Sequence, residues 1–265
     1  MVSRVLYRDA LMLVIDKPAG MAVHQGPPNS RDRSRQCLQD FFDALRFGLP
    51  RPPALAHRLD RDTSGCLVLG RHRKALAQLG KLFRNGAIDK TYWAVVEGSP
   101  DADEGVIEFP LDRLDDRIGW WMKHDPNGQP AVTKWKVMGR GLVTWLALEP
   151  LTGRTHQLRV HCAEMGWPIL GDAVYGTAPR SGGPGMHLHA REIVVPLYKN
   201  RAPVRVVAPV PDQMRERLAA CGWDEERDVL PPRVIPAPSA TGSPESVTPA
   251  QGIWIPHSPL RGDPE

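Results

Sequence analysis

The sequence predicts an α+β fold, with a mixed and largely antiparallel sheet flanked by helices and loops. Strand-like and helix-like segments follow one another without the regular βαβ alternation of a parallel sheet. Short turn signals separate several of the strand-like segments, as they do between antiparallel neighbours. The 265 residues are 42% hydrophobic and 24% charged, which is ordinary for a globular chain with a sizeable core.

The first predicted elements lie between residues 5 and 70. Residues 5–20, VLYRDALMLVIDKPAG, predict two short strands that close at a Pro-Ala-Gly turn. Residues 34–48 carry apolar side chains at helical spacing, which predicts a helix that stops at Gly48. Residues 66–70, CLVLG, predict a short buried strand.

Three further elements follow in the middle of the chain. Residues 72–86 predict an amphipathic helix that ends at Gly86. Residues 90–98, KTYWAVVEG, are rich in β-branched and aromatic side chains and predict a strand. Residues 131–150 predict a hairpin that turns at Gly139-Arg140-Gly141.

The last predicted elements end before a change in composition near residue 230. Residues 155–166 predict a helix with Thr155 as N-cap and Gly166 as its stop, and residues 187–195 predict a strand. Residues 231–265 contain nine prolines and few large apolar side chains. We therefore expect one catalytic domain over residues 1–230 and a disordered tail over residues 231–265.

Charge and cysteine content narrow the class of protein. The net charge is +4 and the pI is near 9.0, which favours an anionic partner such as nucleic acid, although a surface slightly rich in arginine would give the same value. The four cysteines form no C-x-x-C pair and indicate neither a zinc site nor a disulfide framework. The charged start and the lack of a run of about 18 apolar residues predict a cytoplasmic protein with no membrane span.

The stretch AHRLDRDTSGCLVLGR, residues 56–71, sets Asp60 and Asp62 among arginines just before a buried strand. A phosphotransferase Asp-x-Asp loop would follow an apolar strand directly and place its threonine two residues beyond the second aspartate. Here AHR precedes, and Thr63 adjoins Asp62. A surface loop of ion pairs without chemistry also fits these residues, so the stretch alone leaves its function open.

The longer string HRLDRDTSG closely resembles the central signature of the RluA family of RNA pseudouridine synthases. Four other blocks resemble that family in its order: YRDALMLVIDKPAGMAVHQG, KTYWAVVEG, TGRTHQLRVHCAEMGWPILGDAVYG and HLHA. They run from about residue 5 to about residue 209, with no recognisable S4-type RNA-binding segment before the first. The resemblance implies a pseudouridine-synthase-like catalytic domain that acts on tRNA, rRNA or both. No metal, cofactor or obligatory protein partner is implied.

The resemblance also implies roles for individual residues. Asp60 would be catalytic, either as the nucleophile at C1′ of the uridine or as the base that removes the C2′ proton. Arg159 would keep Asp60 charged and oriented through a bidentate pair. Tyr92 would stack on uracil and accept the C5 proton, although a tyrosine in a strand is usually a core residue. Leu188 would pack on the uracil or offer it a backbone hydrogen bond, unless it is an ordinary core residue.

Four basic residues are candidate RNA contacts. The target uridine must be flipped out of a stacked RNA before Asp60 can reach its sugar. Arg58, two residues before Asp60, would fill the vacated stack or hold a phosphate. Lys17, Arg61 and Arg154 would contact the RNA backbone, unless they are solvated surface charges. The histidines have no metal-binding spacing and are expected to be structural.

Two other functions are weighed against this interpretation. A catalytically silent RNA-binding module on the same fold would not need an acid, an arginine and a tyrosine at matching positions, and all three are present. A hydrolase using Asp60 and Asp62 as a carboxylate pair would consume water and could require a metal. The sequence favours the isomerase, and it leaves open which RNA and which uridine are modified.

Overall fold

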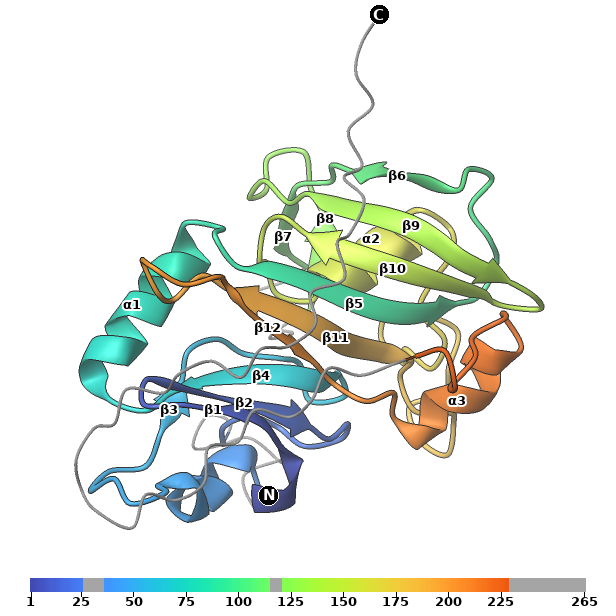
Figure 1. Cartoon of the computed structure of the whole chain (residues 1–265). Coiled ribbons are helices and arrows are strands. Elements are labelled where there is room, and N and C mark those ends of the chain that lie inside the picture. The colour runs from blue at the N-terminus through green and yellow to red at the C-terminus, as the bar shows by residue number, and fades with distance from the viewer. Residues whose placement is uncertain (26–35, 115–120, 229–265) are drawn as a thin grey trace, which may run out of the picture.

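The computed structural model describes residues 1–25, 36–114 and 121–228. Its strands are β1 (Val5–Arg8), β2 (Met12–Lys17), β3 (Ala54–Leu55), β4 (Ser64–Gly70), β5 (Asp89–Val96), β6 (Glu104–Ile107), β7 (Leu111–Arg113), β8 (Met122–His124), β9 (Thr133–Arg140), β10 (Thr144–Pro150), β11 (Leu188–Val195) and β12 (Val204–Val207). Its helices are the 3-10 helices η1 (Val2–Arg4) and η2 (Leu38–Leu45) and the α-helices α1 (Arg73–Arg84), α2 (Gln157–Glu164) and α3 (Asp212–Ala219). Ten strands form one sheet, in which β11 and β5 are central (Figure 1).

The main sheet runs in the order β1-β2-β4-β11-β5-β10-β9-β6, with β12 paired to β11 and β3 paired to β4. Among the described strands, β4 and β11 form the one parallel pair, and the other pairs are antiparallel. The expected α+β fold with a largely antiparallel sheet is confirmed. The parallel pair matters for the site, because the chain leaves the loop of Asp60 and enters β4 at this point.

Gly65 makes the close approach of β4 and β11 possible. It pairs with Ala190, and its φ of +104° lies in the region that glycine adopts without strain. A Cβ atom built at this position would lie 2.2 Å from the carbonyl oxygen of Ala190. Ser64 and Gly65, the first residues of β4, therefore connect the loop of Asp60 to the middle of the sheet.

Helices cover both faces of the sheet, in agreement with the alternation of apolar residues along its strands. In β2, Met12 and Val14 pack in the cluster that includes Leu79 of α1, whereas Leu13 packs in the cluster that includes Phe42 of η2. The cluster of α2 contains Leu146 and Leu148 of β10, and the cluster of α3 contains Trp145. The sheet thus keeps two buried faces, and α2 and α3 lie on opposite sides of β10.

Apart from the helix expected over residues 34–48, the predicted elements of the first hundred residues are confirmed. Strands β1 and β2 pair as expected, but they are joined at residues 9–11, and the Pro-Ala-Gly segment follows β2. Strand β4 is buried along its whole length, and β5 covers Asp89–Val96. Helix α1 ends two residues before Gly86, and His72 caps it by accepting a hydrogen bond from the backbone N–H of Ala75. The helix expected over residues 34–48 is the shorter 3-10 helix η2.

Two predictions in the second half are corrected. The hairpin of β9 and β10 turns at residues 141–143, later than predicted, and Gly139 lies inside β9. Gly139 is required there because a Cβ atom would lie 1.8 Å from the carbonyl oxygen of Cys221. Helix α2 begins after His156, which replaces Thr155 as the N-cap residue, and the predicted stop at Gly166 is confirmed by its φ of +83°.

The predicted tail, residues 231–265, lies outside the described residues. The described chain ends just after α3, an element that the sequence did not predict. In the parts of the chain that the structure describes, no helix is long and apolar enough to cross a membrane. All four cysteines are buried and free.

Candidate active site

A pocket of about 560 Å³ opens where four parts of the fold meet. Its wall comes from the loop before β4, the end of α1, strands β5 and β11, and the loop between β10 and α2 together with the start of α2. Six of the eight predicted site residues line it: Arg58, Asp60, Tyr92, Arg154, Arg159 and Leu188. The structure therefore brings together side chains that are up to 130 positions apart in the sequence.

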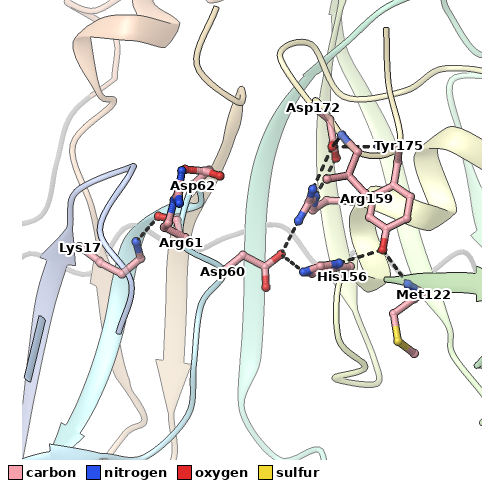
Figure 2. A network of polar contacts seen from close by, with 10 residues as sticks. Lys17, Asp60, Arg61, Asp62, Met122, His156, Arg159, Asp172 and Tyr175 are labelled. Carbon is pink, nitrogen blue, oxygen red and sulfur yellow. Dashed lines mark hydrogen bonds and ion pairs between the residues drawn. The ribbon is translucent and has the colours of Figure 1, made fainter. Parts of the chain in front are cut away.

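Asp60 is the acid at the centre of this pocket, and Figure 2 shows its carboxylate pointing toward α2. Its Oδ2 atom lies 3.3 Å from Nη1 of Arg159 and 3.7 Å from Nε2 of His156. The side chain of Asp60 is 19% exposed, and that of Arg159 is 10% exposed. The expected pairing of Asp60 with Arg159 is therefore present, in a site that retains an opening to solvent.

Arg159 forms a bidentate pair with Asp172 and not with Asp60. Arg159 donates from Nε to Oδ2 of Asp172 at 2.7 Å and from Nη2 to Oδ1 of Asp172 at 2.9 Å. Only its Nη1 reaches Asp60, so the bidentate Arg159–Asp60 pair expected from the sequence is wrong. Asp172 fixes the orientation of the guanidinium, so that its Nη1 atom faces Asp60.

Asp172 is itself held as a charged group. Its side chain is fully buried, and its Oδ1 atom accepts hydrogen bonds from the backbone N–H groups of Val174 and Tyr175. Burial opposes its charge, but the hydrogen bonds and charge of Arg159 and the two backbone donors lower its pKa overall. Burial likewise opposes the charge of Arg159, but Asp172 and then Asp60 raise its pKa. The guanidinium therefore stays positive beside Asp60.

His156 lies on the other side of Oδ2, and its ring bridges Asp60 and Tyr175 (Figure 2). Its Nδ1 atom is 2.8 Å from the hydroxyl of Tyr175, which also accepts a hydrogen bond of 2.8 Å from the backbone N–H of Met122. Burial lowers the pKa of His156 despite the opposing effect of the Asp60 charge. The imidazole is therefore neutral near pH 7.

Tyr92 and Leu188 present side chains on the same face of the sheet. Tyr92 of β5 pairs with Ala190 of β11, and Leu188 pairs with Ala94, so all four side chains point to one side. Both Tyr92 and Leu188 line the pocket of Asp60, and Leu188 is buried. Burial, followed by the nearby charge of Asp60, raises the pKa of Tyr92. Its phenol is therefore protonated at neutral pH.

Lys17 does not have the exposed position that was expected for an RNA contact. Its side chain is fully buried, and its Nζ atom donates to the carbonyl oxygens of Pro18, Met21 and Arg61 at 2.8–2.9 Å. A phosphate could reach this ammonium only by displacing those carbonyls, so the predicted phosphate contact is not supported. Lys17 instead ties β2 to the loop of Asp60 (Figure 2).

The remaining basic residues differ in their access to the pocket. Arg58 is exposed and lines it. Arg154 also lines it, while its guanidinium donates to the carbonyl oxygen of Pro130 and to the side chain of Gln129. Arg61 lies outside the pocket lining and pairs with Asp62 at 3.3 Å.

The histidines considered for metal binding have other partners. His189 contacts the hydroxyl of Ser64 at 2.9 Å, and His187 contacts the carbonyl oxygen of Gly185 at 2.7 Å. Within the described ranges there is no group of three or more histidine, cysteine or acidic side chains that could hold a metal ion.

Sequence reasoning missed three residues of this network: His156, Asp172 and Tyr175. All three lie in the block TGRTHQLRVHCAEMGWPILGDAVYG, so the signal was present. Their roles depend on distances between side chains that the pattern of letters does not contain. The spacing within the block does not indicate that Asp172 would take the bidentate pair of Arg159.

Comparisons with known proteins show what the whole chain is similar to. A model of the RNA pseudouridylate synthase family matches residues 11–164, which include Asp60, Tyr92 and Arg159. An uncharacterized RNA pseudouridine synthase of Zymomonas mobilis is 42% identical over 215 residues, which cover 79% of this chain and 94% of the relative. The ribosomal large subunit pseudouridine synthase C of Vibrio cholerae is 32% identical over 221 residues, covering 81% of this chain and 68% of the relative. The solved structure of human RNA pseudouridylate synthase domain containing 4 has a TM-score of 0.68 and 28% identity, covering 83% of this chain and 94% of that chain.

Proposed function

This chain belongs to the RluA-type RNA pseudouridine synthases, which are isomerases of uridine in RNA, and on that premise we propose that Asp60 is its catalytic residue. The proposed substrates are specific uridines in structured tRNA, rRNA or both. The observation that carries the proposal is the 3.3 Å contact between Nη1 of Arg159 and Oδ2 of Asp60 in the pocket. The pocket volume of about 560 Å³ is in the range that holds a small-molecule-sized group such as a flipped nucleoside.

The chemistry requires a charged carboxylate next to the sugar. Positive charge develops at C1′ when the glycosidic bond breaks, and an ionised carboxylate stabilises that charge. Asp60 would act either as the nucleophile at C1′ or as the base at C2′. Arg159 places a positive charge 3.3 Å from Asp60, and Asp172 keeps the guanidinium oriented before RNA arrives. No redox change or cofactor is needed to move the uracil from N1 to C5.

Tyr92 and Leu188 are proposed to hold the uracil while it is detached. The ring of Tyr92 lines the pocket and offers a flat face on which a pyrimidine can stack. Its phenol is protonated at neutral pH, so its oxygen would accept the C5 proton only after giving up its own proton. Leu188, on the same face of the sheet, would pack against the edge of the base.

The RNA around the target would be held by the exposed arginines. Flipping the uridine costs a few kcal/mol of stacking and pairing. Arg58 lines the pocket mouth two residues before Asp60 and would fill the vacated stack or contact a phosphate. Arg154 and Arg61 would contact the backbone, and such contacts carry most of the affinity without selecting a sequence. Lys17 is left out of this set because its ammonium is buried.

The class of RNA is proposed from the family. The Vibrio cholerae relative is named for the large ribosomal subunit, which makes large-subunit rRNA the first substrate to test. A relative in rice is named as mitochondrial, so the compartment differs within the family. For this chain we propose the cytoplasm, with residues 1–230 as the catalytic domain.

Release of tritium tests the function directly. RNA labelled with tritium at C5 of uridine loses the label to water when C5 joins C1′. Large-subunit rRNA, small-subunit rRNA and tRNA transcripts should be compared, each with and without a chelator. We expect release from at least one RNA, unaffected by the chelator and absent with Asp60→Asn.

Two results would contradict the proposal. Tritium release by Asp60→Asn at a rate near that of the unmodified protein would remove Asp60 from the chemistry. Free uracil in place of pseudouridine would indicate hydrolysis of the glycosidic bond.

A further inference from the structure

Both side-chain contacts of Asp60 converge on one oxygen. Nη1 of Arg159 and Nε2 of His156 each approach Oδ2, at 3.3 Å and 3.7 Å. Among the described residues, no hydrogen-bond donor contacts Oδ1. The two oxygens of the carboxylate are therefore unequal before any substrate binds.

His156 has an unusual backbone conformation for its position. Its φ is +52°, and Phe47 is the other non-glycine residue with positive φ in the described ranges. This left-handed region is unfavourable for residues that carry a side chain, and such strain is retained where the surrounding structure requires it. At residue 156 the strained backbone directs the imidazole between Asp60 and Tyr175.

The partners of the ring determine which nitrogen carries its proton. The backbone N–H of Met122 can only donate, so the oxygen of Tyr175 accepts that hydrogen bond. The phenol then has its own proton to donate to Nδ1 of His156, 2.8 Å away. A neutral imidazole that accepts at Nδ1 carries its proton on Nε2, the atom that faces Asp60.

The opposite tautomer is disfavoured by the same geometry. With the proton on Nδ1, the lone pair of Nε2 would point at the charged oxygen of Asp60. The Met122–Tyr175 hydrogen bond at one end and the carboxylate at the other end therefore favour one tautomer. Figure 2 shows this continuous path from Met122 through Tyr175 and His156 to Asp60.

We propose that His156 is a positioning residue that acts as a neutral donor, held by Tyr175, and directs its Nε2–H to Oδ2 of Asp60. This inference rests on the proposed catalytic role of Asp60. The present separation of 3.7 Å is just beyond hydrogen-bonding distance, and such contacts often shorten when substrate binds. The charged and titratable groups around the pair are Lys17, Arg58, Asp62, Tyr92, Arg159, Asp172 and Tyr175.

The consequence is that Oδ1 is the oxygen that reacts with the sugar. As a nucleophile, Oδ1 forms the bond to C1′ while the C1′–N1 bond breaks and its electron pair leaves with uracil. As a base, Oδ1 takes the C2′ proton while that C–H pair becomes the C1′=C2′ double bond and the N1 bond breaks. In both cases Arg159 and His156 hold the oxygen that does not react.

A pair of amide substitutions separates this role from a structural one. His156→Gln keeps an N–H donor near the position of Nε2 but cannot titrate. His156→Asn is too short to reach Asp60, yet asparagine tolerates the left-handed backbone better than glutamine does. The positioning role predicts that Gln is the more active variant, whereas a purely structural role predicts that Asn is.

The measurements are turnover of saturating labelled RNA and the melting temperature. For His156→Gln we expect turnover within about threefold of the unmodified protein, and for His156→Asn a loss of about 10- to 100-fold, because a donor to a charged group is removed. Tyr175→Phe should fall between the two variants.

Equal turnover of the Asn and Gln variants, near that of the unmodified protein, would overturn the inference. Equal and severe loss in both would also overturn it, because it would mean that His156 acts as a titrating acid or base. Asp60→Asn, assayed in parallel, tests the underlying function separately. If Asp60→Asn is active, the proposed function fails; if it is inactive and the two histidine variants match, only this inference fails.

Discussion

The Nζ atom of Lys17 lies 2.8 Å from the backbone carbonyl of Arg61, one residue beyond Asp60. The same ammonium donates to the carbonyls of Pro18 and Met21 and is fully buried. Burial lowers the pKa of Lys17 to about 8, against the opposing charges of Asp62 and Asp60. The lysine of the first sequence block thus fixes the loop of Asp60 from inside the protein.

Lys17→Met should therefore impair the fold and the loop more than RNA binding. Carbonyls left without a donor should reduce the free energy of unfolding by about 2–4 kcal/mol. Turnover should fall about tenfold while the Kd for RNA changes less than about threefold, because no phosphate contact is removed. Denaturant titration measures the stability, and filter binding measures the RNA affinity. Arg61→Ala is the matched control, because it removes an exposed cation proposed to contact RNA and should weaken binding without lowering stability. A large loss of RNA affinity with unchanged stability would restore the phosphate contact predicted from the sequence.

The two aspartates of the central motif form a matched pair for testing catalysis. Asp60→Asn should abolish pseudouridine formation while RNA affinity and melting temperature stay nearly constant, because phosphate contacts supply most of the affinity. Asp62→Asn should reduce activity only a few fold, since Asp62 pairs with exposed Arg61. Equal losses in the two variants would favour a two-carboxylate mechanism.

Substitution of Arg159 affects both Asp60 and Asp172, because Arg159 pairs with both carboxylates. Arg159→Leu removes the cation beside Asp60 and also leaves the carboxylate of Asp172 buried without its partner. Breaking such a buried pair costs about 3–5 kcal/mol, so this variant should lose stability as well as activity. Its melting temperature must accompany any activity measurement.

Arg159→Lys is the more informative variant. It keeps a charge but cannot pair with two oxygens of Asp172 and reach Asp60 together. We expect turnover between that of the unmodified protein and that of Arg159→Leu. Turnover equal to that of the unmodified protein would mean that the planar guanidinium is not needed beside Asp60.

Local patterns predicted most of the sheet and its helices. The strand pair of residues 5–20 and helix α1 follow from short-range signals, short apolar runs in the first and helical spacing with Gly86 in the second. Thr155 failed as an N-cap because His156 takes the left-handed conformation that its ring contacts require. Gly139 failed as a turn because its role is to let the backbone of Cys221 approach.

The site also contains contacts that the sequence did not predict. The family resemblance identified Asp60 and Arg159, which are 99 positions apart, and the structure brings them to 3.3 Å. It did not indicate that Asp172 would take the bidentate pair or that Lys17 would be buried. Those facts depend on long-range packing, which residue types and spacing do not encode.

Acid should destabilise the protein through two histidines, the half-buried His57 at the pocket wall and the fully buried His189. Burial lowers the pKa of each to about 3 from an ordinary value of 6.5. In the window between those values the unfolded chain binds more protons, so the free energy of unfolding rises with pH and falls on acidification. At pH 5 each histidine should contribute a loss of about 2 kcal/mol.

His57→Gln tests this titration within the loop of Asp60. Nε2 of His57 accepts a hydrogen bond from the backbone N–H of Val68, and its ring stacks on Phe83. Glutamine can also accept that bond but does not titrate. The variant should lose about 2 kcal/mol less than the unmodified protein between pH 7 and pH 5. Denaturant titrations at the two pH values measure it, and parallel curves would show that His57 does not carry the effect.

The C-terminal boundary of the domain can be tested at Asp228, which pairs with the buried guanidinium of Arg191. That guanidinium also donates to the carbonyl of Ala208 and lies over the ring of Trp93, with 4.4 Å to the ring centroid. Trp93 is adjacent to Tyr92 in β5, so the pair anchors the end of the described chain to the strand of the active site.

Removal of residues 231–265 should leave the melting temperature nearly unchanged and the activity within a few fold of that of the full chain. The composition of these residues offers little apolar area to bury. Asp228→Ala in the shortened chain should lower the free energy of unfolding by about 3–5 kcal/mol, since the buried charge of Arg191 would lose its carboxylate partner. Asp224→Ala is the matched control, because Asp224 pairs with Arg227, which is 88% exposed.

Melting curves and tritium release of the three proteins separate the outcomes. If shortening alone unfolds the chain or ends its activity, the boundary lies beyond residue 230; if the Asp228 and Asp224 variants are equally stable, the Arg191 pair does not hold the end of the domain.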